Sequence, residues 1–479
     1  MEGTPLTFTQ DLCQYLVGMS AEDVWKKCTP AKHVKNDIMQ NAGQYTDDRA
    51  DDIFKDIRYK TLDWIGCVIG ALDKESSRSI LEISLEAGGN PHCTAFGLKE
   101  KTSPFQAAYS NGILGHTLEY DDVNKVAITH PGAIAIPAAL AVAEYCGADF
   151  ETYAMGVVAG YEVMIRLGAA LNPTHYEFWH TTGTCGAFAA AAAASRVLGL
   201  DAETMGRALG IAATMASGLT SVFGTDAKLV TVGNAVSAGL KAACLARKGY
   251  SVPGDVIERE GGYAQAASRS WNPDYLIPKE DDMLMIQDSY YKIHASCGHT
   301  HSALDALQKI KKEHEFTADE VASVSVNAYK KAVELTGRFQ CDTELRSKFS
   351  MPYCIGAMLV YGETGLMQFT EKVRTDERIL ALKDKITVEE DAAYTAEYPH
   401  LRIEQLTVRL KDGRAWSEKV ELPDGKPSSE YIERKYMSLA GLTVSQEIAG
   451  AVKDTILNLQ MNSSMRECGD RIRGEIGGI

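Results

Sequence analysis

The segment Cys185–Leu198 reads CGAFAAAAAASRVL, and it belongs to the most apolar run of the chain. Alanine and glycine side chains let neighbouring helices approach closely. Similar small-residue segments, with helical character, occur at Gly132–Tyr145, Tyr153–Ala170 and Ala202–Ser217. The run is too short and too weakly hydrophobic to span a bilayer. We therefore predict a tightly packed helical core rather than a sheet protein.

Other segments of the first 270 residues or so support this prediction. Asp52–Gly66 and Glu75–Ala87 carry apolar residues at helical spacing, and Gly233–Leu245 is another small-residue helix. Strand–helix–strand segments with a glycine fingerprint are absent from the sequence, so a dinucleotide-binding fold is unsupported.

The pattern changes after about residue 285. Val321–Tyr329 and Leu401–Leu410 alternate apolar and polar residues, as half-buried strands do. Asp412 and Gly413 then precede Ala415–Leu422, which is a hairpin signal. Two helical segments accompany these strands, Ala303–His314 and Pro352–Leu359. Helices with antiparallel strands indicate an α+β domain.

The chain becomes helical again in Ser428–Leu439 and Ser445–Leu459. The simplest interpretation is that these last helices dock on the first domain, so that the α+β segment is an insertion. The predicted fold class is mainly α with an inserted α+β lid domain. The predicted parts are residues 1–285 and 424–479 for the helical domain and 286–423 for the lid.

Composition limits the classes of function. The chain has 479 residues, of which 45% are hydrophobic and 24% charged, and its formal net charge is −15. An acidic surface argues against nucleic acid and anionic membranes as partners. The eleven cysteines form no C-x-x-C pair, and Met1–Tyr15 lacks the pattern of a signal peptide. We therefore expect a cytoplasmic protein with free thiols.

One turn-rich segment gathers three carboxylates and an imidazole. Glu119-Tyr120-Asp121-Asp122 is followed, after seven intervening residues, by His130-Pro131-Gly132 and an apolar helix. Histidine titrates near neutral pH, and a nearby carboxylate fixes its tautomer and raises its pKa. A helix start also attracts anions. This combination suits a proton donor beside a bound carboxylate, although His130 could equally be a histidine that caps a helix.

The three acids are not equivalent. Asp121 and Asp122 are adjacent, so regular structure would not point both inward, whereas Glu119 and Asp122 could share a helical face. At least one of them is expected to be a solvated loop residue. Calcium and magnesium sites usually need more oxygen ligands at ordered spacing, so a metal is not expected here.

Two further candidates lie beside small-residue helices. Lys228 has apolar neighbours, and a partly buried lysine needs a counter-charge that a substrate carboxylate could supply. A surface lysine is the alternative. His180 precedes the alanine-rich helix and by itself would be a buried polar turn.

The segment Lys292–His301, with the sequence KIHASCGHTH, lies where the pattern changes and two domains would meet. Domain boundaries are preferred places for clefts. Cys297, His299 and His301 have single-residue gaps that suit a structural zinc site poorly. A packed cysteine and a helix-capping histidine are the alternatives for Cys297 and His301.

In this order, these motifs resemble those of the MmgE/PrpD family. The matching segments are the acidic motif with His130-Pro131-Gly132, Trp179–Gly183, Lys228–Gly233, Lys292–His301 and Ser347–Tyr353. The resemblance covers nearly the whole chain. It implies a helical domain built from both ends of the chain, an inserted α+β lid, a homodimer and a pocket in the cleft between the domains. It also implies that Glu119, His130, Lys228, Lys292, Cys297 and His301 line this pocket.

The sequence departs from the family pattern at several positions. The first acid is Glu119 instead of aspartate, and Val123 stands where many members have threonine. Cys297 occupies a position that is histidine in some decarboxylases, and Gly298 replaces a frequent arginine. The loop before His130 resembles that of the fungal decarboxylases. These changes remove or move polar contacts in the pocket.

The resemblance implies a lyase for a small di- or tricarboxylate that needs no metal or other cofactor. A reaction like that of 2-methylcitrate dehydratase is the first hypothesis. The alternatives are an itaconate-forming cis-aconitate decarboxylase, an epimerase of an imino- or aminodicarboxylate such as iminodisuccinate, and a non-catalytic carboxylate-binding protein. The catalytic candidates are His130, Glu119, Asp122 and Lys292, with Glu119 and Asp122 orienting His130. The substrate-binding candidates are Lys228, His180, Cys297 and His301.

Overall fold

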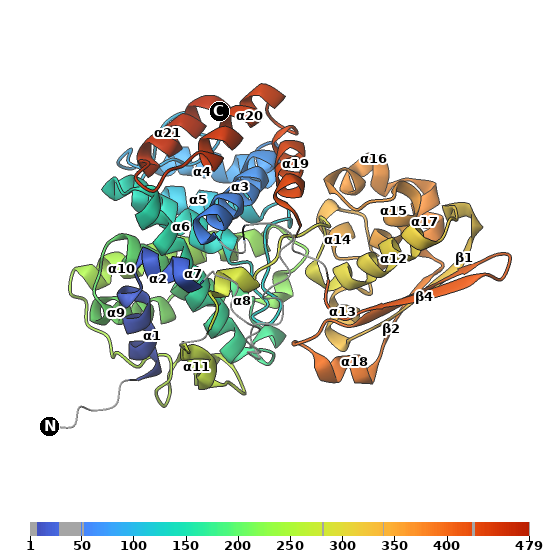
Figure 1. Ribbon diagram of the computed structural model, residues 1–479, viewed down its shortest axis with the longest axis horizontal. Helices are drawn as coiled ribbons and strands as arrows, with labels where there is room; N and C mark the ends of the chain where they lie inside the picture. The colour runs from blue at the N-terminus through green and yellow to red at the C-terminus, as the bar shows by residue number, and fades with distance from the viewer. Residues whose placement is uncertain are drawn as a thin grey trace. The chain divides into compact units, whose positions relative to one another are not determined.

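A computed structural model gives the fold of the chain (Figure 1). It describes residues 7–27, 49, 52–279, 282–338, 340–423 and 427–478. The chain forms two compact units, one of Met1–Tyr291 with Lys426–Ile479 and the other of Lys292–Gly425. The first six residues of the N-terminal segment considered above, and residue 424 at the predicted domain boundary, lie outside the described residues.

The first unit, called the helical unit below, is built from helices, and all named strands lie in the other unit. Its helices before the second unit are α1 (Phe8–Gly18), α2 (Ala21–Lys27), α3 (Ile53–Ala71), α4 (Glu75–Ala87), α5 (Pro104–His116), α6 (Gly132–Cys146), α7 (Phe150–Leu171), α8 (Thr181–Val197), α9 (Ala202–Ala213), α10 (Ala227–Arg247) and α11 (Tyr263–Ala267). The helices after it are α19 (Ser429–Ala440), α20 (Gln446–Leu457) and α21 (Met465–Ile476).

Helix α8 is the centre of this unit. Apart from Arg196 all its residues are buried, and it packs against α6, α7, α9 and α10. The approach of α10 is so close that a Cβ atom on Gly239 would lie 2.4 Å from the Cβ of Ala190. The small residues of the quoted segment therefore allow the helices to pack at short distance, as predicted.

In the part of the chain that the structure describes, two helices, α7 and α10, are long and apolar enough to cross a membrane by length and composition alone. The most apolar window of α7 is entirely buried within the protein, and that of α10 is 67% buried. Burial of this kind is typical of core helices in soluble proteins.

The C-terminal helices complete the helical unit. Helices α19 and α20 pack on α3, and α21 packs on α6. Backbone contacts add to this packing, because the amide of Phe150 donates to the carbonyl of Ser463 and the amide of Met465 donates to that of Ala148.

The second unit combines short helices with one four-stranded sheet of order β2-β1-β3-β4. Its elements are α12 (His301–Glu313), β1 (Val321–Ala328), α13 (Lys330–Thr336), α14 (Glu344–Lys348), α15 (Met351–Tyr361), α16 (Glu371–Arg374), α17 (Glu377–Lys383), β2 (Ile386–Glu390), α18 (Ala392–Glu397), β3 (Glu404–Leu410) and β4 (Ala415–Val420). Helix α12 packs on β3 and β4, and α15 packs on β2. The chain is therefore mainly helical with a smaller α/β unit.

The prediction of antiparallel strands was incomplete. Strands β1, β3 and β4 pair antiparallel, with Val324 opposite Val408 and Val408 opposite Trp416. Strand β2 was not predicted, and it pairs parallel to β1 with Val324 opposite Ile386. Parallel neighbours need a long connection, which helices α13 to α17 supply here.

Candidate active site

The candidate site lies where several helices of the helical unit begin or end. Residues 117–131 connect α5 to α6, and they carry the acidic motif and His130. His116 is the last residue of α5, and Lys228 lies in the first turn of α10. Helix ends place these side chains beside backbone groups that the helices leave without intrahelical partners.

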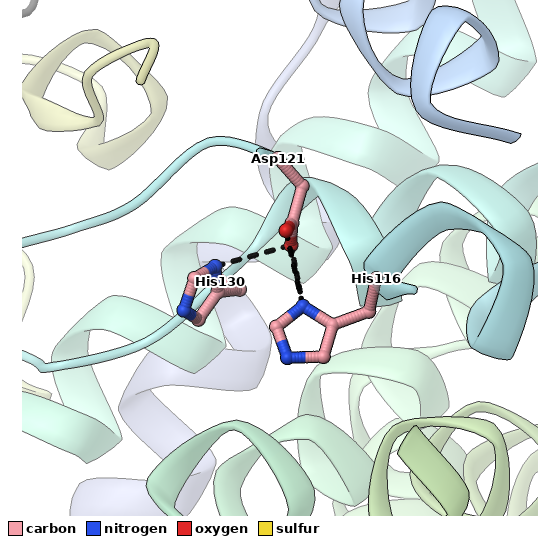
Figure 2. A group of neighbouring side chains, drawn as sticks. All are labelled: His116, Asp121 and His130. Atoms are coloured by element: carbon pink, nitrogen blue, oxygen red, sulfur yellow. Dashed lines mark hydrogen bonds and ion pairs between the residues drawn. The ribbon is translucent and has the colours of Figure 1, made fainter. Parts of the chain in front are cut away.

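Asp121 lies between two imidazoles (Figure 2). Its carboxylate accepts hydrogen bonds from Nδ1 of His116 at 2.9 and 3.1 Å. Nδ1 of His130 lies 3.1 Å from Oδ2 of the same carboxylate, which is an ion-pair distance without full hydrogen-bond alignment. Burial alone would raise the pKa of Asp121, but His116 and His130 outweigh it and hold this pKa well below its usual value.

His130 is more accessible than its partners. Its side chain is 14% exposed, whereas that of His116 is fully buried. Its backbone amide donates to Oγ1 of Thr182 in α8, which fixes the approach of the chain to α6. No described residue forms a hydrogen bond with Nε2 of His130, and in Figure 2 this nitrogen points away from Asp121. His130 therefore has one nitrogen tied to a carboxylate and one available for proton transfer.

The structure gives Asp122 a different contact from the one that we predicted. Its Oδ1 accepts from the amide of Gly132 at 2.8 Å, and its Oδ2 accepts from the hydroxyl of Tyr161 at 2.7 Å. Asp122 thus caps the start of α6 and pairs with Lys60 at 3.5 Å, and none of its hydrogen bonds or ion pairs within the described residues involves His130. Both Asp121 and Asp122 are buried, contrary to our expectation, because the chain is irregular here and points the two side chains to different partners.

Glu119 does not share a helical face with Asp122, since it adopts a left-handed φ of 55°. This conformation is uncommon for a residue other than glycine and is often found at functional sites. It directs the buried carboxylate to Lys228, with which it forms an ion pair, and its Oε1 lies 3.4 Å from Nε2 of His116. The counter-charge that sequence analysis assigned to the substrate is therefore already present in the chain.

His180 lies directly before α8 and is 2% exposed. Its Nδ1 lies 2.7 Å from Oγ1 of Thr231, whose hydroxyl donates to the carbonyl of Lys228. Burial, followed by the nearby His116 and His130, lowers the pKa of His180 well below its usual value. His180 is therefore a neutral neighbour of the same cluster.

One atom each of His116, Asp121 and His130 lie within 4.8 Å of one another, a spacing that would allow a divalent ion. However, the ammonium group of Lys228 lies 2.9 Å from Nε2 of His116 and would repel a cation. The contacts of His116 and His130 with Asp121 are enough to explain why these three residues lie so close together.

The remaining candidates lie in the second unit. Lys292 is fully buried, Cys297 is 6% exposed, and the Cys297 amide donates to the carbonyl of Lys348. His301 begins α12, and its Nε2 lies 3.3 Å from the carbonyl of Ser296. Burial, then His294 and Lys292, lowers the pKa of His301 well below its usual value.

Comparison with known proteins agrees with this arrangement of motifs. The family model of the MmgE/PrpD N-terminal domain matches residues 41–276, and that of the MmgE/PrpD C-terminal domain matches residues 294–460. The chain belongs to the MmgE/PrpD family. The family resemblance predicted from the motifs is thereby confirmed.

Named MmgE/PrpD relatives match most of the chain. Cis-aconitate decarboxylase of Aspergillus terreus is 27% identical over 447 residues, 86% of this chain and 90% of the relative. Cis-aconitate decarboxylase of Homo sapiens is 26% identical over 376 residues, 74% and 77% of the two chains. The 2-methylcitrate dehydratase of Salmonella typhimurium is 21% identical over 399 residues, 77% and 80% of the two chains.

Two residues of this cluster were not predicted as functional residues: His116, which precedes the acidic motif, and Asp121, which belongs to it. His116 precedes Asp121 by only five residues, so a short-range search for carboxylate and imidazole pairs would have found it. The bend that brings the two together follows from the left-handed Glu119, which no periodicity indicates.

Proposed function

We propose that this chain is a lyase that decarboxylates a small tricarboxylate of the cis-aconitate type. The observation that carries the proposal is the contact of His130 with the buried, ionised Asp121, which leaves one imidazole nitrogen available. The higher identity of the decarboxylases than of the dehydratase supports the same choice.

Decarboxylation and dehydration differ in the number of protons that the protein must transfer, and this difference favours decarboxylation. Decarboxylation breaks one carbon–carbon bond, releases carbon dioxide and leaves an electron pair that one proton must meet. Dehydration instead removes a proton from carbon and delivers another to the departing hydroxyl. Within the helical unit's cluster, His116 and His180 are buried and held neutral, so His130 is the group suited to carry a single proton.

His130 would act as the general acid in this proposal. Protonated on both nitrogens, it is stabilised by Asp121 and gives the proton on Nε2 to the carbon next to a substrate carboxylate. In cis-aconitate the electron pair left by carbon dioxide forms a new double bond, and the proton joins the far carbon of the old one, which gives itaconate. General acid catalysis of this kind contributes on the order of 10²–10⁴ in rate.

Substrate recognition is the second part of the proposal. The buried Lys292, with Cys297 and His301, is assigned to substrate contacts in the second unit. A buried ammonium group attracts a carboxylate strongly because little solvent screens it. Replacing Lys292 by methionine should raise KM for the tricarboxylate more than it changes kcat. An unchanged KM would remove Lys292 from the binding site.

A panel of acids tests the reaction. The protein is incubated with cis-aconitate, 2-methylcitrate and iminodisuccinate in deuterated water, and products are followed by NMR. We expect cis-aconitate to lose carbon dioxide and the product to gain one carbon-bound deuterium. Three results would each overturn the proposal: dehydration of 2-methylcitrate without decarboxylation of cis-aconitate, deuterium entering unreacted iminodisuccinate, or binding of the acids with no turnover of any of them.

His130→Gln is the matched variant for this panel. We expect decarboxylation to fall on the order of 10²–10⁴ while thermal unfolding stays close to that of the wild type. His92→Gln is the control, because His92 is an exposed imidazole of the same unit whose ring contacts Tyr145. An equal loss in both variants would contradict the role of His130.

A homodimer is a further proposal, which follows from the family resemblance, and the cytoplasm stays the compartment expected from the scattered cysteines. Sedimentation of the purified chain over a range of concentrations tests the oligomeric part. A monomer at all concentrations would contradict it.

A further inference from the structure

A continuous chain of charged and polar groups leads from Glu119 to His130 in the helical unit. Glu119 pairs with the ammonium group of Lys228, and that ammonium group lies 2.9 Å from Nε2 of His116. His116 contacts Asp121 through Nδ1 at 2.9 Å, and Asp121 contacts His130 at 3.1 Å. Each of these five residues therefore contacts the next.

The proton positions in this chain follow from donor and acceptor chemistry. A lysine ammonium group has three donors and no acceptor. His116 must therefore accept the bond from Lys228 with the lone pair of Nε2, which places its own proton on Nδ1. That proton is directed at Asp121, and the carboxylate is a pure acceptor when ionised. Burial lowers the pKa of His116 to about 3, which agrees with a neutral ring.

This tautomer has a consequence for His130. Asp121 receives a hydrogen bond from His116 on both of its oxygens, and it offers Oδ2 to Nδ1 of His130. An ionised carboxylate at this distance favours a proton on Nδ1 of His130. The exchangeable proton of His130 is then the one on Nε2, which points away from the cluster (Figure 2).

We propose that Lys228 and His116 are positioning residues that fix the tautomer of His130 through Asp121. Lys228 would thus control a proton position rather than hold a substrate carboxylate. The inference rests on the proposed function of His130 as proton carrier. It adds residues that neither the motif analysis nor the relatives' names assign to this role.

Imidazole nitrogen NMR tests the inference without any substrate. The chain is labelled with ¹⁵N in its histidine rings, and the signals are assigned with the variants His116→Asn and His130→Gln. We expect His116 to show the Nδ1–H tautomer and not to titrate between about pH 5 and 8, the range in which an ordinary histidine changes charge. A wild-type His116 with its proton on Nε2, or one that titrates in this range, would overturn the inference.

Lys228→Met should release this control. Without the ammonium group, we expect His116 to show mixed tautomers and the Nδ1–H signal of His130 to weaken. Glu119→Gln combined with Lys228→Met avoids a lone buried carboxylate and should give the same result if the single variant unfolds. His175 is the internal control, since it is buried and its Nδ1 donates to the carbonyl of Ala267, away from Lys228. Unchanged signals of His116 and His130 in the folded variant would overturn the inference.

Two substitutions of His116 separate positioning from simple packing. In His116→Asn the amide nitrogen takes the place of Nδ1 and still donates to Asp121, whereas in His116→Gln it takes the place of Nε2. We expect the asparagine variant to keep more of the rate, with the pH profile of kcat/KM shifted less than in the glutamine variant. Equal rates and equal profiles would contradict the positioning role. Normal tautomers in a protein that turns over no acid would instead contradict the proposed function alone.

Discussion

The two units each contain a buried pair of aspartate and histidine, and the pairs differ in what lies beyond the carboxylate. In the helical unit, Asp121 serves both His116 and His130, and the ring of His130 is partly exposed. In the second unit, Asp305 lies 3.0 Å from Nε2 of His294, while Nδ1 of that ring lies 2.7 Å from Oγ1 of Thr364. In the helical unit, Nε2 of His130 stays available, whereas both ring nitrogens of His294 in the second unit have partners.

This difference separates a ring suited to proton transfer from a ring that stabilises the fold. A buried histidine with partners on both nitrogens satisfies its hydrogen bonds and has nothing to exchange. A ring that has one nitrogen fixed by a carboxylate and the other accessible can take up and release a proton. The residue types are the same, so partners and access decide the role.

The largest expected effect is a loss of kcat in Asp121→Asn, and the matched variant Asp305→Asn tests whether this loss is specific to the helical unit. Asp121→Asn removes the negative charge from His130 and presents an amide donor, so the proton of His130 moves to the wrong nitrogen. We expect kcat for the tricarboxylate to fall on the order of 10²–10⁴. Steady-state kinetics at saturating substrate measure this effect.

Asp305→Asn is the matched control in the second unit. It should leave kcat near that of the wild type and lower the free energy of unfolding by roughly 1–3 kcal/mol, because a buried hydrogen bond loses its charged partner. Denaturant titrations of both variants measure this cost. If the two variants lost kcat to a similar degree, the comparison between the pairs would be broken.

Much of the helical fold follows from sequence periodicity. Glu75–Ala87 was predicted as a helix and α4 has these bounds, since apolar residues at helical spacing end at two glycines. Helix α10 begins at Ala227, six residues before the predicted Gly233. The prediction relied on small residues, and the first turn carries the larger side chains of Lys228, Leu229 and Val230 instead.

The second unit was predicted less completely. The hairpin of β3 and β4 was predicted because alternation and Asp412-Gly413 are local signals, and Gly413 does adopt a φ of 93°. Strand Ile386–Glu390 was missed, since only Ile386 is buried and the alternation is too short to detect. Its parallel pairing with β1 depends on the tertiary fold, which no local pattern shows.

For the site, the sequence pointed to His130 and Lys228 but not to their partners. The assumption of regular structure favoured Glu119 and Asp122 over Asp121 as neighbours of His130. The left-handed turn at Glu119 and the capping of α6 by Asp122 change this order. Both features depend on contacts with distant residues, Lys228 and Tyr161, which spacing along the chain does not reveal.

Another buried carboxylate sharpens the comparison, because Glu144 has no imidazole partner among the residues that the structure describes. It accepts hydrogen bonds from the amide and hydroxyl of Thr94, and Nζ of Lys101 lies 3.8 Å away. Burial outweighs these contacts and raises the pKa of Glu144 from 4.5 to about 7. Asp121, which has two imidazoles, shows the opposite shift.

Glu144 should therefore make stability fall as pH rises. Below its unfolded pKa of 4.5 the group is protonated in both states and its contribution is fully present, and this contribution is lost as pH rises to about 7. The loss is about 3 kcal/mol, from 1.36 kcal/mol for each unit of pKa. Subtracting the denaturant-unfolding free energy of Glu144→Gln from that of the wild type, from acid to mildly alkaline pH, measures it.

The difference in unfolding free energy between the wild type and Glu144→Gln isolates the contribution of Glu144 from that of other titrating groups. His175 acts in the opposite direction, since burial lowers its pKa to about 4 and its contribution grows as pH rises toward 6.5. The contribution of His175 is the same in the wild type and in Glu144→Gln, so it cancels when one unfolding free energy is subtracted from the other. A difference that stays constant with pH would show that Glu144 is ionised in the folded protein and would remove the contrast with Asp121.

The smallest expected effect concerns the start of α6, which holds His130 in place. A Cβ atom on Gly132 would lie 2.6 Å from Oδ1 of Asp122 and 2.9 Å from the hydroxyl of Tyr161. Gly132→Ala should therefore displace the capping carboxylate and lower the free energy of unfolding by roughly 1–3 kcal/mol. Because residues 130 and 132 share this turn, kcat should fall as well. Denaturant titration and steady-state kinetics measure the two effects.

Gly450→Ala provides the matched control, since a Cβ atom there meets nothing within 4 Å and the residue lies inside α20. Alanine is favoured over glycine in a helix by up to about 1 kcal/mol, so this variant should be slightly more stable and equally active. If Gly132→Ala lost stability but kept full kcat, the capped turn would serve the fold alone. The Asp121 contact would then be enough to orient His130, and the two Asp–His pairs would differ only in the access of their rings to solvent.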